Sequence, residues 1–243
     1  MATGANETPA RLNVGRAGAR YKTATLLKFR ADHARAVDAV LTEVGAGWPR
    51  KSRLIEFHSE AATRDEYLHH PELGRRLRRD EIAKLKTLNV KRNDARPSVL
   101  IFIGDGLSSS AVEANAPLLL RALTKMIETR YRLLKPIFVR NARVRLEDHL
   151  GEILRCDLIC MIVGERPGLA TAESLSAYVI HRPRLSSLEP DRTVISNIHR
   201  GGIPPAQAAN LIARLIDDAM RHRATGAKLA ALLADVAADT HGG

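Results

Sequence analysis

The sequence predicts an α/β protein: a mainly helical N-terminal part followed by a Rossmann-like, mostly parallel sheet flanked by helices. Helical hydrophobic patterns dominate up to about residue 97. After it, short and continuously apolar runs alternate with helical stretches, as in βαβ units. Because right-handed crossovers bring the carboxyl ends of parallel strands to one edge, we expect a ligand crevice at that edge.

The N-terminal half is expected to hold an arm, residues 1–22, and a mainly helical domain, residues 23–97. The arm is basic without hydrophobic periodicity, so it is either flexible or ordered by a partner. Apolar residues recur every three or four positions from Thr25 to Val44, which predicts an amphipathic helix. A shorter helix is predicted from Asp80 to Leu88, and Leu54 to Phe57 is too short to assign.

Residues 98–243 are expected to form the α/β domain. The predicted strands are Val99 to Ile103, Ile137 to Val139, Leu158 to Val163 and Val194 to Ile198. The predicted helices are Ser110 to Arg130, Leu146 to Arg155, Ala172 to Tyr178, Pro205 to Arg223 and Ala227 to Ala238.

A glycine turn, Gly104-Asp105-Gly106, follows the first of these strands and precedes a Ser-rich helix start. Glycine lets a ligand approach the backbone, and a helix N-terminus favours an anion. The pattern Gly104-x-Gly106-x-x-Ser109 resembles the dinucleotide fingerprint without its third glycine, so a plain strand–helix turn is favoured over a dinucleotide site.

Polar loops follow two further predicted strands. Glu165 and Arg166 come after the apolar run LICMIV, and Gly201-Gly202 comes after the strand that begins at Val194. Three such loops at one edge are what a site at a topological switch point requires. The alternative for Glu165 and Arg166 is an internal ion pair that shapes their loop.

No catalytic side chain and no metal site are predicted. Cys156 and Cys160 have no further cysteine or suitably spaced histidine, so we expect small core residues. The serines at 108–110 lack the pattern of a nucleophile elbow, and no GxxxxGK phosphate loop occurs.

Charge is the unusual feature of the composition: 38 basic against 27 acidic residues, a net charge of +11. The densest basic run, Arg75 to Arg79, is interpreted as a solvated helix face or as a surface that docks on an acidic protein. Nucleic acid is disfavoured as a partner, because an aromatic content of 4% provides few stacking platforms. Without a membrane-length apolar run or a signal peptide, the protein is expected to be soluble and intracellular.

Several segments occur together, in order, from about Val14 to beyond Ala206. They are VGRAG, LLKFRADHARAVDAVL, YLHHPELGRRL, GDGLSSSAVEAN, FVRNARVRLEDHLGEIL, VGERPGL with SLSAY, and DRTVISNIHRGG with PP. In these segments the chain resembles the small subunit of ethanolamine ammonia-lyase, an adenosylcobalamin-dependent enzyme.

The resemblance implies a hetero-oligomer in which cobalamin lies between this subunit and a large barrel subunit. The large subunit would hold ethanolamine and deaminate it by radical chemistry to acetaldehyde and ammonia, while this subunit closes over the cobalamin and orients it. No nucleic acid and no membrane are implied. Some similar subunits carry a longer N-terminal extension associated with microcompartments, and the short N-terminus here favours cytoplasmic residence.

The family's cobalamin contacts map onto Val144 in NARVRLED, Glu165 in GERPG and the variable position of DRTxISN, which is Val194 here. Similar proteins can carry cysteine at that last position, so a sulfur contact is lost while a packing contact can survive. Ordinary loop packing is the alternative for each residue. His149 does not fit the DxHxxG spacing, so it is expected to be a helix residue, with cobalamin retaining its own base. The alternative function is a stand-alone basic nucleotide- or nucleic-acid-binding protein.

Overall fold

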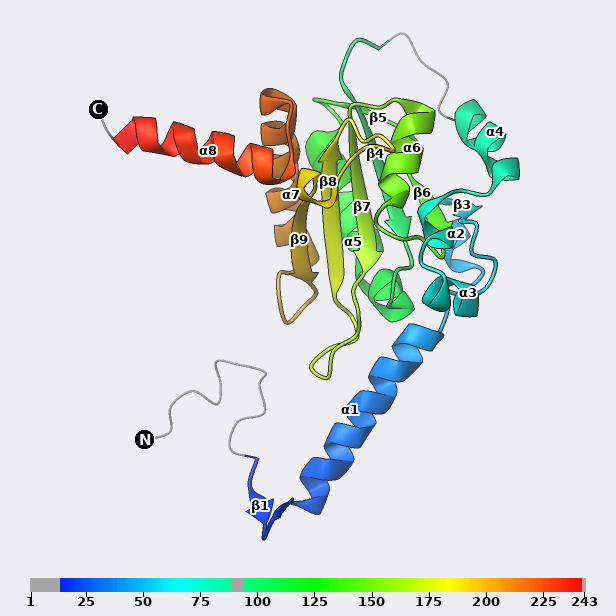
Figure 1. Ribbon diagram of the computed structural model, residues 1–243, viewed down its shortest axis with the longest axis vertical. Helices are drawn as coiled ribbons and strands as arrows, with labels where there is room; N and C mark the ends of the chain where they lie inside the picture. The colour runs from blue at the N-terminus through cyan, green and yellow to red at the C-terminus, as the bar shows by residue number, and fades with distance from the viewer. Residues whose placement is uncertain (1–13, 89–93, 242–243) are drawn as a thin grey trace.

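The computed structural model describes residues 14–88 and 94–241. Its centre is one mixed sheet with helices on both faces, and helices α1 (Thr23–Leu41) and α8 (Gly226–His241) extend away from it (Figure 1). The predicted α/β class with a mostly parallel, helix-flanked sheet is confirmed. Most of the predicted arm, residues 1–13, lies outside the described part of the chain.

The sheet has the strand order β3-β6-β4-β7-β8-β9, with β5 paired to β4. Its strands are β3 (Ile55–His58), β4 (Ser98–Gly104), β5 (Arg132–Leu133), β6 (Ile137–Arg140), β7 (Leu158–Gly164), β8 (Leu175–His181) and β9 (Thr193–Ile198). The strands from β3 to β7 are parallel, and β8 is antiparallel to both of its neighbours. The carboxyl ends of β4, β6, β7 and β9 therefore share one edge.

Helices α5 (Ser109–Ile127) and α7 (Pro205–His222) pack on one face of the sheet, and α6 (Leu146–Leu154) packs on the other. The connection from β4 to β6 runs one way along the sheet, and the connection from β6 to β7 runs back past β4. Since both crossovers are right-handed, their helices must lie on opposite faces. Every residue of β4 and β7 is buried between them, as continuous apolar runs predict.

The prediction of a helix from Ala172 to Tyr178 is wrong. This segment leads into β8, which forms an antiparallel hairpin with β7 and a second hairpin with β9. Leu175, Ala177 and Val179 enter the core shared with α5 and α7, so the period of this segment is two and not 3.6. Pairing on both sides of the strand outweighs the weak local helical pattern.

The unassigned segment Leu54 to Phe57 becomes β3, a strand at the edge of the main sheet. The part before residue 97 also contains helices and a short β-hairpin. The division of the chain into two domains at residue 97 stays a prediction. The remaining elements are the hairpin β1 (Arg16–Ala17) and β2 (Arg20–Tyr21), helices α2 (Trp48–Lys51), α3 (Arg64–His69) and α4 (Arg79–Leu88), and the 3-10 turns η1 (Leu73–Arg75) and η2 (Glu189–Asp191).

Candidate functional site

The turn after β4 supports neighbouring loops and does not present a ligand surface. Asp105 is fully buried, and its carboxylate accepts hydrogen bonds from the backbone N–H groups of Asn141 (2.8 Å) and Ala142 (3.1 Å). Burial raises the pKa of Asp105, and these two donors oppose that shift. Asp105 therefore fixes the start of the β6–α6 loop, which carries Val144.

The glycines at this edge allow the turn after β4 and the turn after β7 to pack backbone against backbone. A Cβ at Gly106 would lie 2.3 Å from the Gly164 carbonyl oxygen, and one at Gly164 would lie 2.2 Å from the Ser108 carbonyl oxygen. The Leu107 N–H also donates to the Gly164 carbonyl at 3.0 Å. The expectation that a ligand approaches this turn is not met, because the turn after β7 occupies the position. Ser108 caps α5 and bonds to the Ala172 carbonyl, so the helix start is also covered.

Glu165 joins three strands. Its Oε1 accepts a hydrogen bond from the Ser176 hydroxyl on β8 (2.5 Å) and another from the Asn197 N–H on β9 (3.0 Å). Asn197 has a φ of +60° and lies where the register between β8 and β9 shifts. The Glu165 carboxylate thus stabilises a bulge. Among the described residues, Arg166 forms no ion pair with Glu165 or Asp105, so the alternative of an internal ion pair is not found.

Val194 lies on the same face of the sheet as the side chains that surround Glu165. It pairs in register with Tyr178 of β8, and paired residues project to one face. Ser176 shares that face, since alternate residues of a strand do. Burial, and then the negative charge of Glu165, raise the pKa of the half-buried Tyr178. The structure therefore brings two predicted site residues, Glu165 and Val194, onto one surface.

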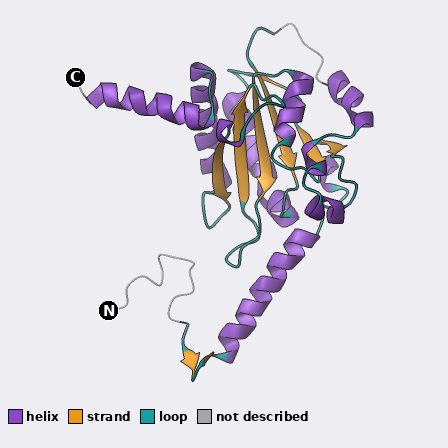
Figure 2. Cartoon of the chain, in the orientation of Figure 1, coloured by secondary structure: helices purple, strands orange, loops and turns teal. Residues whose placement is uncertain are grey.

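This surface is open. Val194 is 46% exposed, and Ser196 on the same strand is exposed as well. Within the described residues, α6 covers the middle of the sheet, while β8 and β9 carry no long helix on that side (Figure 2). We call this region the β8–β9 face.

Val144, the third predicted site residue, lies in the loop between β6 and α6. It is partly buried and packs against the core cluster on the α6 side of the sheet, and Tyr178 packs against the same cluster. All three predicted residues are thus on one side of the sheet, with the loops of Val144 and Glu165 flanking the end of β4.

A buried ionic cluster, which the sequence analysis did not single out, lies behind these loops. Arg192 donates from Nε to Glu147 Oε2 at 3.1 Å, and it also bonds to Asp148. Both carboxylates belong to the first turn of α6. Burial raises the pKa of Glu147 to about 8, against the opposing effect of the Arg192 guanidinium. The pairing spans 45 residues of sequence, so no local pattern could reveal it.

His149 is a helix residue, as predicted. It lies in α6, and its Nδ1 accepts a hydrogen bond from the Leu77 N–H at 2.9 Å. Partial burial lowers its pKa. Cys156 and Cys160 are buried, also as predicted, and burial raises the pKa of the Cys156 thiol to about 12.

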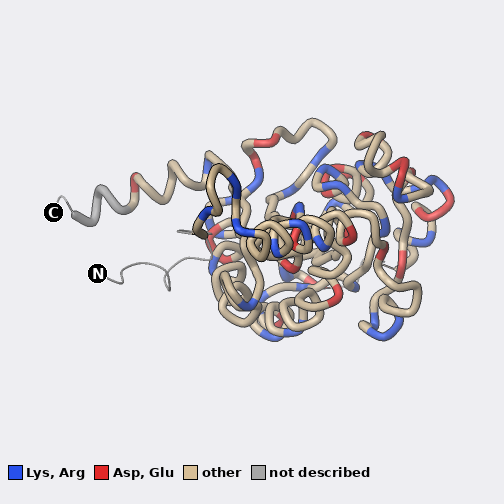
Figure 3. The backbone as a smooth tube through the Cα atoms, turned by 90° about the horizontal axis from the view of Figure 1, so that it is seen from below, with Lys and Arg blue, Asp and Glu red and all other residues tan. Residues whose placement is uncertain are grey.

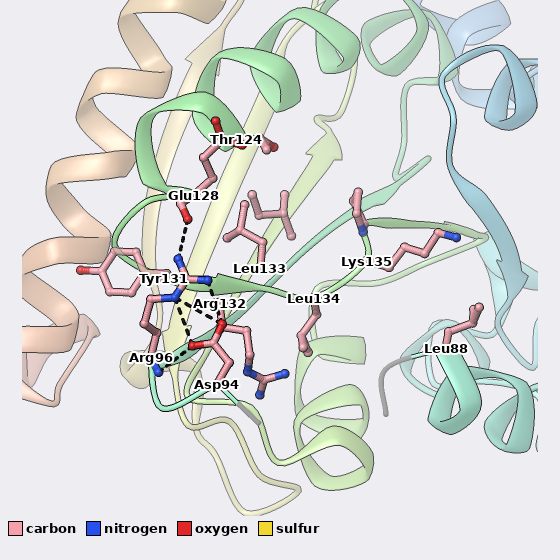
Figure 4. Close-up of a pocket in the computed structure, with 12 residues that line it drawn as sticks. Leu88, Asp94, Arg96, Thr124, Glu128, Tyr131, Arg132, Leu133, Leu134 and Lys135 are labelled. Atoms are coloured by element: carbon pink, nitrogen blue, oxygen red, sulfur yellow. Dashed lines mark hydrogen bonds and ion pairs between the residues drawn. The ribbon is translucent and has the colours of Figure 1, made fainter. Parts of the chain in front are cut away.

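A cavity of about 630 Å³ opens at the opposite edge of the sheet, beside the start of β4 and β5 (Figure 4). Arg96 crosses it, bound to Asp94 and to the Glu128 carbonyl. None of the three predicted site residues lines this cavity. Val144, Glu165 and Val194 therefore lie on an exposed face and in the loops that border it. Such a position suits a ligand that is bound between two chains better than a ligand that is enclosed by one chain.

Comparison with known proteins identifies the family. The family model for the ethanolamine ammonia-lyase light chain matches residues 2–230. The chain belongs to this family. It is 45% identical over 225 residues to the ethanolamine ammonia-lyase small subunit of Lachnoclostridium phytofermentans, covering 92% of this chain and 75% of that protein. The small subunits of Clostridioides difficile and Listeria monocytogenes are 44% and 43% identical, covering 92% and 91% of this chain and 75% of each relative.

Two further findings concern the part of the chain that the structure describes. In the part of the chain that the structure describes, no cluster of three or more His, Cys, Asp or Glu side chains is arranged to hold a metal ion. No helix there has both the length and the apolar character needed to cross a bilayer.

Proposed function

We propose that this chain is the small subunit of an adenosylcobalamin-dependent ethanolamine ammonia-lyase, and that it closes over the cobalamin and orients it against a larger catalytic subunit. The observation that carries this proposal is the open β8–β9 face, where Glu165 and Val194 share one surface, in a chain of the light-chain family. Val144 borders the same side of the sheet.

The chemistry of these residues suits a corrinoid. A corrin ring carries methyl groups and amide side chains at its rim, so it needs apolar contacts together with a few hydrogen-bond acceptors. Val144 and Val194 provide apolar surface. The Glu165 carboxylate has acceptor capacity beyond the two bonds that its Oε1 receives. The amide side chains of a corrin ring carry N–H groups that can donate a hydrogen bond to such a carboxylate.

The work of this chain is positioning. When bound, adenosylcobalamin supplies the radical chemistry that starts the conversion of ethanolamine to acetaldehyde and ammonia. Glu165 would hold an amide of the ring edge, and the two valines would pack on the ring and exclude water there. Valine at position 194 offers packing in place of a thiol. Ethanolamine and the reacting atoms belong to the partner subunit in this proposal.

Reconstitution tests the proposal. Ammonia release from ethanolamine should appear only when this chain, the large subunit and adenosylcobalamin are mixed. The affinity for cyanocobalamin, measured by equilibrium dialysis, should rise when this chain is added to the large subunit. If the large subunit binds cyanocobalamin equally well alone, the closing role is wrong.

Replacing Glu165 separates its two roles. Glu165→Ala should weaken cyanocobalamin binding by about 1–3 kcal/mol, because the buried Ser176 hydroxyl and, in the complex, an amide of the corrin ring would lose their acceptor. Glu165→Gln keeps an oxygen for Ser176 and Asn197 and should retain more of the affinity. Glu152→Ala removes a carboxylate from α6 that pairs with Arg155, so it serves as the control. Unchanged affinity in Glu165→Ala would reduce Glu165 to a loop-packing residue.

A further inference from the structure

Arg192 fastens two segments that are far apart in the sequence. Its side chain is 3% exposed, and the side chains of Glu147 and Asp148 are 0% and 3% exposed. The guanidinium donates to an oxygen of each of these two acidic side chains and, from a terminal nitrogen, to the Leu188 carbonyl at 2.8 Å. We call Arg192, Glu147 and Asp148 the Arg192 cluster.

Each side of the Arg192 cluster leads directly to a predicted cobalamin contact. On one side, the Glu147 N–H donates to the Val144 carbonyl at 3.1 Å, so Val144 is tied to the first turn of α6. On the other side, Arg192 immediately precedes β9, whose second residue is Val194. One guanidinium thus sets the spacing between the loop of Val144 and the strand of Val194.

Arg145 reinforces this connection from outside. It donates to Asp148 Oδ2 at 3.1 Å and to the Ser187 carbonyl at 3.1 Å. The segment before β9 is therefore held at Ser187 to Arg145, the residue that precedes α6, and at Arg192 to α6 itself, while the bond from Arg192 to the Leu188 carbonyl fixes the segment internally. Segments with several fixed points of this kind have little freedom to shift.

Stability alone does not account for such a cluster. Removing an arginine and two acidic side chains from water is costly, and well-packed apolar residues in their place are often neutral or stabilising. What a guanidinium adds is a rigid, planar fork of N–H donors that fixes the oxygens of two acidic side chains in a defined geometry. This fixed geometry is useful for holding two chain segments in a defined relative orientation.

We propose that Arg192 is a positioning residue that holds Val144 and Val194 at the separation required for cobalamin. This inference rests on the proposed function, because it takes these two residues to be cobalamin contacts. Arg192 is fully enclosed by its partners, so it acts through the two segments and does not touch the ligand.

The test uses Arg192→Lys and Arg192→Met in the complex with the large subunit. Lysine keeps the charge but loses the fork, and it is the variant more certain to fold. Hydrogen exchange of the small subunit should speed up both in 141–146 and in 187–196. Affinity for cyanocobalamin should fall on the order of tenfold in Arg192→Lys and further in Arg192→Met, as when other groups that orient ligands are removed.

Leu123→Ala is the control for general destabilisation. Leu123 is buried in α5, on the face of the sheet away from α6. This variant should lower the thermal midpoint while leaving cyanocobalamin affinity and exchange in 141–146 unchanged. If it weakens cyanocobalamin binding as much as Arg192→Lys does, a positioning role is excluded.

The remaining outcomes separate this inference from the proposed function. If Glu165→Ala and Val194→Asp weaken cyanocobalamin binding while Arg192→Lys and Arg192→Met bind normally, the positioning role is overturned and the proposed function stands. If neither Glu165→Ala nor Val194→Asp affects binding, the contacts themselves are wrong, and the inference falls with them.

Discussion

Glu147 is a carboxyl group that the fold removes completely from water. Its neighbours are the Asp148 carboxylate, which disfavours its ionisation, and the Arg192 guanidinium, which favours it. Burial is the largest of these effects, and it raises the pKa of Glu147 from 4.5 to about 8. Protonation of one side chain is therefore coupled to folding.

The sign of this coupling predicts how stability depends on pH. The unfolded chain releases the Glu147 proton near its ordinary pKa of 4.5, while the folded chain retains it up to about 8. The free energy of unfolding should therefore fall as pH rises from about 4.5 to 8. Glu147→Gln should remove this component. Urea unfolding at several pH values, for both proteins, measures it.

Only the difference between the two proteins isolates Glu147. Burial lowers the pKa of His149 and His181, so their contribution to stability is lost as pH falls, which is the opposite trend. Both histidines remain in Glu147→Gln. Parallel pH profiles for the wild-type chain and the variant would contradict the assignment.

At the scale of elements, the turns after β4 and β7 interlock through glycine. Each turn occupies the space that a side chain on the other would need. The sequence predicted a turn after each of these two strands, and this is confirmed, but no sequence pattern showed that the two turns touch. Contact between chain segments almost sixty residues apart depends on strand order, which local patterns do not encode.

Gly164→Ala tests this interlock. The new Cβ would meet the Ser108 and Asp105 carbonyl oxygens at 2.2 and 2.7 Å, and backbone cannot move away cheaply. We expect a loss of about 1–3 kcal/mol or more in the free energy of unfolding. Gly168→Ala is the matched control, because its Cβ would lie 3.8 Å from the nearest atom, the Thr171 carbonyl oxygen. Chemical denaturation compares the two, and equal losses would argue against the interlock.

At the scale of the whole molecule, the sequence predicted the elements whose hydrophobic pattern follows directly from burial in the core. The apolar runs of β4 and β7 and the helical periods of α5 and α7 were assigned correctly. Long-range pairing decided the rest: β8 is a strand because β7 and β9 flank it, and β3 is a strand because β6 pairs with it. The predicted site residues came from family motifs, while the Arg192 cluster required coordinates.

The basic run Arg75 to Arg79 does not form one helix face. Arg75 ends η1, Arg79 begins α4, and Leu77 between them is fully buried. Across the described chain, Lys and Arg positions are distributed over many elements and alternate with Asp and Glu (Figure 3). Docking of this run on an acidic protein surface stays a prediction.

Dispersed charge predicts weak nucleic-acid binding. We expect no saturable binding of single-stranded RNA in filter assays at about 0.15 M salt, where exposed charges are screened beyond about 8 Å. Micromolar binding that persists at this salt, and that is lost when Arg75, Arg76, Arg78 and Arg79 are changed to glutamine, would favour a stand-alone nucleic-acid-binding protein.

The reversal of direction at β8 has a consequence for how this family can vary. A parallel β8 would have required a crossover, and its right-handed course would have laid a helix beside α6, over Val194. The hairpin leaves that face accessible because its connection, residues 165–174, is short. Changes of connection length are therefore more damaging here than many side-chain exchanges. Relatives should tolerate substitution at position 194 more readily than an insertion that lets 165–174 fold into a helix.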